Sequence, residues 1–221
     1  MMEKILSEKE SLELINSMIS SARNNLQKGT GNIFLLWGYV IALLALANLV
    51  LLLIFPQVVS HYAYCVWFAT PLGIFGYFYL LRQNQKIQIV TTYVDKVLTY
   101  VWIAFGISVL VLVVFMLLYS IPGFRGESGP LAFMHWVHWF FMIPFMLMLY
   151  GFALFVSGLA YGFKPLVIGA VICWACTLIL SLLTNFDHAM EIQLVSLILS
   201  VIAGFIIPGH LLTIKEKKHV P

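Results

Sequence analysis

Charged side chains are scarce in this chain. Asp, Glu, Lys and Arg make up 10% of its 221 residues, whereas soluble globular domains carry about 25%. Hydrophobic residues make up 62%. This balance excludes an ordinary soluble domain. The formal net charge of +3 is small and dispersed along the chain, so nucleic acid is not indicated as a partner.

Cysteine is also rare. The three cysteines, Cys65, Cys173 and Cys176, all fall within apolar stretches, so a secreted disulfide framework is not expected. Cys173 and Cys176 have the CxxC spacing of thiol oxidoreductases, but the pair falls near the middle of an apolar run. A thiolate there is poorly solvated and a weak nucleophile. The favoured interpretation is two small residues that pack against a neighbouring helix.

Processing and catalytic signatures are missing as well. The first apolar run begins near Ile33, behind a mostly polar segment, and lacks the short charged start and cleavage site of a signal peptide. We therefore expect residues 33–55 to be a retained membrane span. No phosphate-binding glycine loop and no Ser-His-Asp signature is present, which leaves an enzyme uncertain and less favoured.

Long uncharged runs are what the sequence does contain. A bilayer span needs about 20 apolar residues, and residues 134–161 hold no Asp, Glu, Lys or Arg. The sequence predicts an all-α integral membrane protein with six transmembrane helices arranged as three hairpins. The predicted spans are 33–55, 61–81, 97–119, 133–161, 166–184 and 192–212. The third helix is expected to start early and to project beyond the bilayer.

Proline and glycine are unevenly distributed among these spans. Pro71, Pro144 and Pro208 fall in the second, fourth and sixth spans, together with most of the glycines. Kinks and small residues allow helix backbones to approach closely. We expect the even-numbered helices to form the centre of the bundle, and Gly158-xxx-Gly162 to belong to this close packing.

The segment before the first span has a different pattern. Ile5, Leu12, Ile19 and Leu26 recur every seven residues, so residues 1–28 are predicted to form an amphipathic helix, followed by a turn up to residue 32. Such a helix can pair with another helix, lie on the membrane surface or pack under its own bundle. Residues 213–221 are predicted to form a basic tail.

The distribution of Lys and Arg predicts the orientation. Cytoplasmic loops carry an excess of these residues. With both termini inside, the inner side holds eleven of them and only Arg125 lies outside. The N-terminal helix and the basic tail are therefore expected in the cytoplasm. The inner residues are Lys4, Lys9, Arg23, Lys28, Arg82, Lys86, Lys96, Lys164, Lys215, Lys217 and Lys218.

Histidines and carboxylates gather on the predicted outer face. His135 and His138 share one side of the fourth helix, and His188 and Glu191 begin the sixth. These four residues form a candidate zinc site, with a water completing the coordination. Two histidines from different helices could instead ligate a haem iron. The alternative is structural: the histidines bond lipid headgroups, and Asp187 or Asn185 caps the sixth helix.

Two polar aromatic residues fall near mid-membrane. Tyr150 and Trp174 need hydrogen-bond partners there, and Asn48, Thr70 and Thr177 could supply them. One interpretation is that these hydrogen bonds hold the helices in place. The other is a cavity for a small apolar or lipid-like ligand, lined by Tyr150, Trp174 and Asn48. Because no span has an acid, Lys or Arg in its interior, a proton-driven transporter is disfavoured, whereas a passive path or a lipid-binding bundle is not.

Near the start of the chain, residues 11–19, 25–32 and 36–39 read SLELINSMI, NLQKGTGN and LWGY. In these residues the chain resembles uncharacterised multi-span bacterial membrane proteins of similar length. The likeness covers mainly residues 11–45. The family has no assigned activity, and the resemblance implies a bacterial inner-membrane location only.

Two functional hypotheses follow. The first is a non-enzymatic interaction or accessory subunit, surrounded by lipid, that engages a partner protein or a second copy of itself through residues 1–28; it needs no cofactor. The second is a membrane-embedded zinc or haem protein that uses the outer His and Glu residues.

Overall fold

The computed structural model describes residues 9, 11–13, 16, 29–54, 66–67, 69–84, 93–120, 141–182 and 188–218. Over these residues the protein is all-helical and has no strand. The helices are α2 (Thr30–Ile54), α3 (Thr70–Asn84), α4 (Tyr93–Ser120), α6 (Met142–Ala160), α7 (Lys164–Leu182), α8 (Ala189–Val201) and α9 (Ile207–Lys218). A π-helical segment, η4 (Ile202–Ile206), joins α8 to α9. This fold confirms the predicted helical class.

Five of these helical stretches are long and apolar enough to cross a membrane. They are α2, α4, α6, α7 and the continuous α8–η4–α9, and they correspond to the first, third, fourth, fifth and sixth predicted spans. The second predicted span, 61–81, is described only in part. Its helix α3 has 15 residues, which is fewer than the roughly 20 that a bilayer requires. The structure thus gives five candidate spans, and a sixth stays a prediction.

Several predicted boundaries differ from the observed ones. Helix α4 does start early, at Tyr93. Helix α9 continues to Lys218, so residues 213–218 extend the last helix. The helix of the fourth predicted span is described from Met142 onwards, and residues 133–140 lie outside the described residues. Of the N-terminal segment, residues 9, 11–13 and 16 are helical, and the rest of the predicted helix 1–28 is not described.

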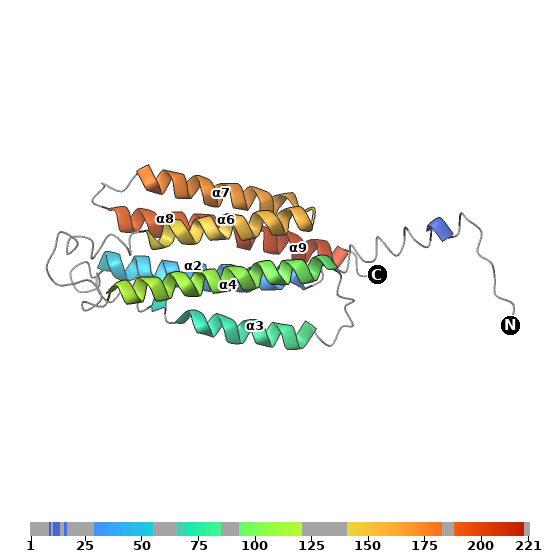
Figure 1. Ribbon diagram of the computed structural model, residues 1–221, viewed down its shortest axis with the longest axis horizontal. Helices are drawn as coiled ribbons and strands as arrows, with labels where there is room; N and C mark the ends of the chain where they lie inside the picture. The colour runs from blue at the N-terminus through green and yellow to red at the C-terminus, as the bar shows by residue number, and fades with distance from the viewer. Residues whose placement is uncertain are drawn as a thin grey trace.

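The long helices lie side by side with roughly parallel axes, with α7 at one edge and α3 at the other (Figure 1). The α8–η4–α9 rod packs against α2 and α7 along its length, and α6 also contacts α8. The hairpin of α6 and α7 has the most extensive contacts of any described pair. It turns at Gly162, whose φ of 60° is in the left-handed region that favours glycine.

The prediction that the even-numbered helices form the centre is wrong for the second one. Helix α3 packs mainly against α2, and its glycines serve that contact. A methyl group on Gly73 would touch the Trp37 ring, and one on Gly76 would touch the Leu36 side chain. The small residues of α3 therefore fit it to α2 at the edge of the bundle, where it has no comparable contact with the described parts of α6 or α8.

Only one of the three prolines interrupts a described helix. Pro71 and Pro144 are the second and third residues of α3 and α6, where a missing N–H leaves no hydrogen bond unmade. Pro208 follows η4. There the Ile207 N–H donates to the Ile202 carbonyl, five residues back, which is the π-helical pattern. The local change in winding accommodates a proline in a long helix.

Aromatic rings fill the centre of the bundle. Phe105 of α4 stacks on Tyr150 of α6, with ring centroids 5.2 Å apart. Tyr150 also meets Phe205 of η4 edge-on at 5.2 Å. Phe34 of α2 lies 5.8 Å from Phe205 and 5.7 Å from Trp102 of α4. These five rings join four elements into one core, since offset and edge-to-face ring pairs add to the stability from area burial.

Candidate functional site

The structure describes only some of the residues of the predicted outer-face site. His188 Nδ1 lies 3.4 Å from Glu191 Oε1 at the start of α8. The His188 side chain is 80% exposed and that of Glu191 is 27% exposed, so the pair faces outward. Glu191 is in the first turn, where the helix dipole favours a negative charge. The N-cap residue is His188, without a side-chain cap hydrogen bond, and the two predicted capping residues, Asp187 and Asn185, lie outside the described residues.

The other two predicted ligands, His135 and His138, lie outside the described residues, as does Asp187. Within the part of the chain that the structure describes, no three His, Cys, Asp or Glu residues come together. A structural zinc ion has four ligands and a catalytic one has three from the protein. The structure therefore brings together two of the four predicted ligands, and the metal site stays a prediction.

Basic side chains gather at the opposite end of the bundle. Arg82 is in the last turn of α3, Lys96 and Lys164 are in the first turns of α4 and α7, and Lys215 is in α9. These helix ends lie at the same end of the bundle in Figure 1, and all four side chains are exposed. We call this the basic end. An excess of Lys and Arg is typical of the cytoplasmic side of a membrane protein, and the orientation of the bundle stays a prediction.

Sequence reasoning missed a polar pair on the bundle surface. The Tyr39 hydroxyl of α2 lies 2.8 Å from His210 Nε2 of α9, and both residues are exposed. His210 is inside the candidate span Ala189–Lys215. The two residues are 171 positions apart, so no local spacing signals the pair. It links the first and last described helices of the bundle.

The predicted mid-membrane residues take separate structural roles. The Trp174 indole N–H donates to the Met148 carbonyl at 3.3 Å, so none of the three predicted partners supplies this bond. Thr177 donates to the Cys173 carbonyl at 3.0 Å, and its hydroxyl also lies 3.4 Å from the Pro144 carbonyl. Thr70 bonds the Trp67 carbonyl at 2.6 Å. These contacts support the structural interpretation of Trp174.

The remaining two residues of the predicted cavity are both buried. Tyr150 is in the aromatic core, and Asn48 is only 3% exposed on α2. Cys173 and Cys176 are free thiols. Cys173 is buried against η4, since a methyl group on Gly204 would lie 3.8 Å from its sulfur. The CxxC pair thus occupies the packing position that the sequence suggests.

A few polar atoms in the described core are buried without a hydrogen-bond partner. Gln193 of α8 is 1% exposed, and both polar atoms of its amide are without a hydrogen-bond partner. Ser157 of α6 is fully buried with an unpaired hydroxyl. A buried polar group without a partner costs about 1–3 kcal/mol. Among the described residues, Gln193 is therefore the buried side chain with the most unpaired polar atoms.

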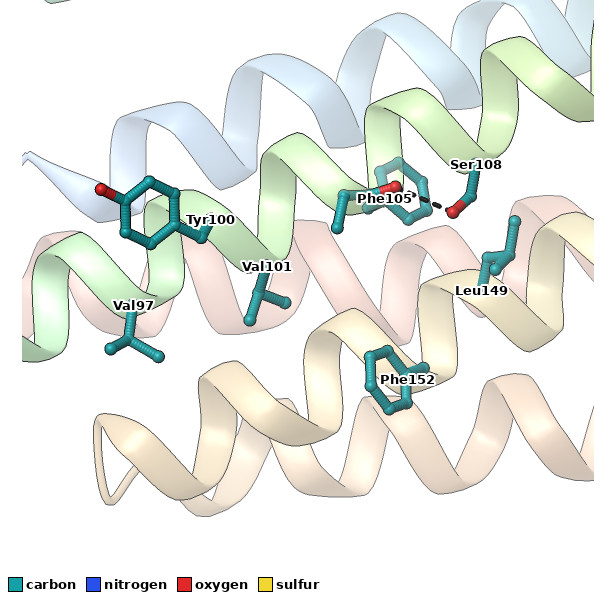
Figure 2. Close-up of a pocket in the computed structure, with 8 residues that line it drawn as sticks. Val97, Tyr100, Val101, Phe105, Ser108, Leu149 and Phe152 are labelled. Carbon is teal, nitrogen blue, oxygen red and sulfur yellow. Dashed lines mark hydrogen bonds between the residues drawn. The ribbon is translucent and has the colours of Figure 1, made fainter.

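A hollow opens between α4 and α6. It has a volume of about 390 Å³, and Figure 2 shows the side chains around it. None of Tyr150, Trp174 and Asn48 lines it. The lining residues are Val97, Tyr100, Val101, Ala104, Phe105, Ser108, Leu149 and Phe152. We call it the α4–α6 groove. It is apolar apart from two hydroxyls, and sequence reasoning missed it because it needs the pairing of two helices.

Comparison with known proteins does not assign the chain to a family. No protein-family model, no curated protein and no solved structure matches the chain. The functional argument therefore stands on the residues and their geometry.

Proposed function

We propose that this protein is a non-enzymatic interaction or accessory subunit of a bacterial inner membrane. It engages a partner protein, or a second copy of itself, through residues 1–28. The proposal rests on the basic end of the bundle, where α2 begins directly after this segment. A concentration of exposed Lys and Arg is a surface for an acidic partner segment or for anionic headgroups.

The exposure of Leu12 supports this over packing beneath the protein's own bundle. Leu12 belongs to the heptad series of the N-terminal segment, and it is 61% exposed. Lys9 and Glu13 beside it are exposed too. An apolar heptad position that is not covered by its own bundle gains stability when another helix covers it. Covering a leucine side chain contributes about 1.5–3 kcal/mol.

Deletion of residues 1–26 tests the proposal. We expect the truncated protein to keep the helical content and melting temperature of the full chain in detergent, and to lose its dimer or its co-purified partner. The measurements are circular dichroism, light scattering after gel filtration, and identification of co-purified chains. An assembly that survives the deletion unchanged would reject this function.

A matched pair of point variants sharpens the test. Leu12→Glu places a charge in the apolar series, and we expect it to reproduce the loss of assembly. Glu13→Gln changes the neighbouring exposed residue and should leave assembly intact. Equal behaviour of the two variants would show that the apolar series is not the contact.

A second candidate function is a metal centre at the His188 end of the bundle. The observation that favours it is the 3.4 Å approach of His188 to Glu191, which pairs a nitrogen and an oxygen donor of the kinds that zinc takes. Elemental analysis and an absorption spectrum of the purified protein test it. We expect one zinc per chain, lost in His188→Ala and kept in His210→Ala. Less than stoichiometric zinc together with no Soret band would reject both zinc and haem.

A further inference from the structure

The α4–α6 groove has the form of a binding site for a hydrocarbon chain. Six of its lining residues form two rows along α4, each spaced by four residues, so they share one face of that helix. Leu149 and Phe152 of α6 form the opposite side (Figure 2). The stacked rings of Phe105 and Tyr150 lie beside it. The hollow exists because Ala104 and Ser108 are too short to fill the space between the helices.

The lining offers little to a polar ligand. The Ser108 hydroxyl donates to the Ala104 carbonyl at 2.8 Å, which uses its only hydrogen. The remaining surface is hydrocarbon and aromatic ring, apart from the hydroxyl of Tyr100. Apolar chains fit such a surface, because a polar group placed there would lose hydrogen bonds without replacement.

The length of the groove matches one leaflet of a membrane. From Val97 to Ser108 the helix rises about 16 Å, at 1.5 Å per residue. The hydrocarbon core of a bilayer is about 30 Å thick. The candidate span of α4 runs from Lys96 to Leu118, so Val97 is at its edge and Ser108 is near its middle. The groove therefore extends from headgroup level to the midplane, as one acyl chain does.

An exposed cation precedes the first lining residue of the groove. Lys96 directly precedes Val97 and is exposed, one turn before Tyr100. Tyr100 is 68% exposed and lies one turn from the edge of the candidate span at Lys96, close to the level where tyrosines meet lipid headgroups. Lys96 is also part of the basic end. A long lysine side chain extends toward a headgroup phosphate while its methylenes stay on apolar surface.

We infer that the α4–α6 groove binds one acyl chain of an anionic glycerophospholipid, with Lys96 holding its phosphate and headgroup. The binding is specific because two features coincide: a hollow one leaflet long and a cation at its mouth. A helix from a second copy is a poorer fit, since packed helices need axes 8–10 Å apart along several turns. This site is independent of the segment 1–28.

Native mass spectrometry of the full chain tests the inference. Delipidated protein in detergent receives equimolar phosphatidylglycerol and phosphatidylethanolamine. We expect one phosphatidylglycerol to be retained in preference to phosphatidylethanolamine. Lys96→Gln should lower that preference about fivefold, since a cation at the membrane surface contributes of this order to anionic lipid binding. Ala104→Phe, which fills the hollow, should abolish the retained lipid.

Two control variants match these changes. Arg82→Gln removes another exposed cation of the basic end, and Gly106→Leu adds bulk to α4 where a methyl group would meet nothing within 4 Å. Both should leave lipid retention unchanged. Equal retention of the two lipids by the wild type would overturn the inference. So would equal losses in Lys96→Gln and Arg82→Gln, or a lipid-free dimer that Ala104→Phe disrupts. Lys96→Gln changes an exposed side chain in the first turn of α4, so it tests the site without disturbing the core.

Discussion

Gly169 of α7 lies directly against Gly204 of η4. A methyl group on Gly169 would come 2.5 Å from the Cα of Gly204 and 2.9 Å from the carbonyl oxygen of Ala203. Backbone therefore meets backbone at this crossing. Such close approach is how helices associate in membranes, where lipid is as apolar as the side chains and tight packing supplies the attraction.

Substitution at this crossing should destabilise the bundle. We expect Gly169→Ala to cost about 1–3 kcal/mol, the range for overpacking a close contact, because the neighbouring atoms are backbone and cannot rotate away. The melting temperature in detergent measures it. Gly106→Ala is the matched control, since a methyl group there meets nothing within 4 Å, and alanine is the better helix former. Equal melting of the two variants would contradict the backbone contact.

The buried amide of Gln193 leads to the opposite expectation. Because both of its polar atoms lack partners, Gln193→Met should raise stability by about 1–3 kcal/mol, the desolvation penalty that the amide carries. Methionine is unbranched and fills a similar space. Thermal melts in one detergent measure the change.

Ser157→Ala is a useful comparison for Gln193→Met. It also removes a buried, unpaired polar atom, but a smaller one, so a gain of the same sign is expected. A large loss of stability in Gln193→Met would show that the amide has a bound partner in the membrane.

The Tyr39–His210 hydrogen bond should couple α2 to α9. Tyr39→Phe removes only the hydroxyl that meets His210 at 2.8 Å, and we expect a loss of about 0.5–1.5 kcal/mol. A double-mutant cycle with His210→Ala isolates the pair, since contacting residues give non-additive effects. Strictly additive losses would mean that the Tyr39 hydroxyl and the His210 ring do not interact.

Hydropathy predicts five of the six expected spans in agreement with the structure, because the thickness of a bilayer sets the length of an apolar run. The sequence indicates the five candidate spans and the early start of α4, and it suggests close packing at Gly158, where a methyl group would touch Val167 of α7. Which helices pack against each other is harder to predict from the sequence. In hydrocarbon an apolar helix has no distinct buried face, so Gly73 and Gly76 give no sign that their partner is α2.

The candidate sites also differ in whether the sequence can predict them. His188 and Glu191 are three residues apart, so their proximity follows from helix geometry alone. The α4–α6 groove and the Tyr39–His210 pair need helices that are distant in sequence, and no local pattern reports them. The π-helical segment Ile202–Ile206 also escapes prediction, because Pro208 signals a disturbance without specifying its form.

The orientation of the bundle is open to a direct test with exposed positions at its two ends. The His188 side chain is 80% exposed at one end, and Lys164 is exposed at the basic end. In a background with Cys65, Cys173 and Cys176 changed to alanine, we expect His188→Cys to react with an impermeant thiol reagent on intact bacterial cells. Lys164→Cys should react only after the cells are opened, because an excess of Lys and Arg marks the cytoplasmic side. The reverse pattern would place the basic end outside, and with it the mouth of the α4–α6 groove.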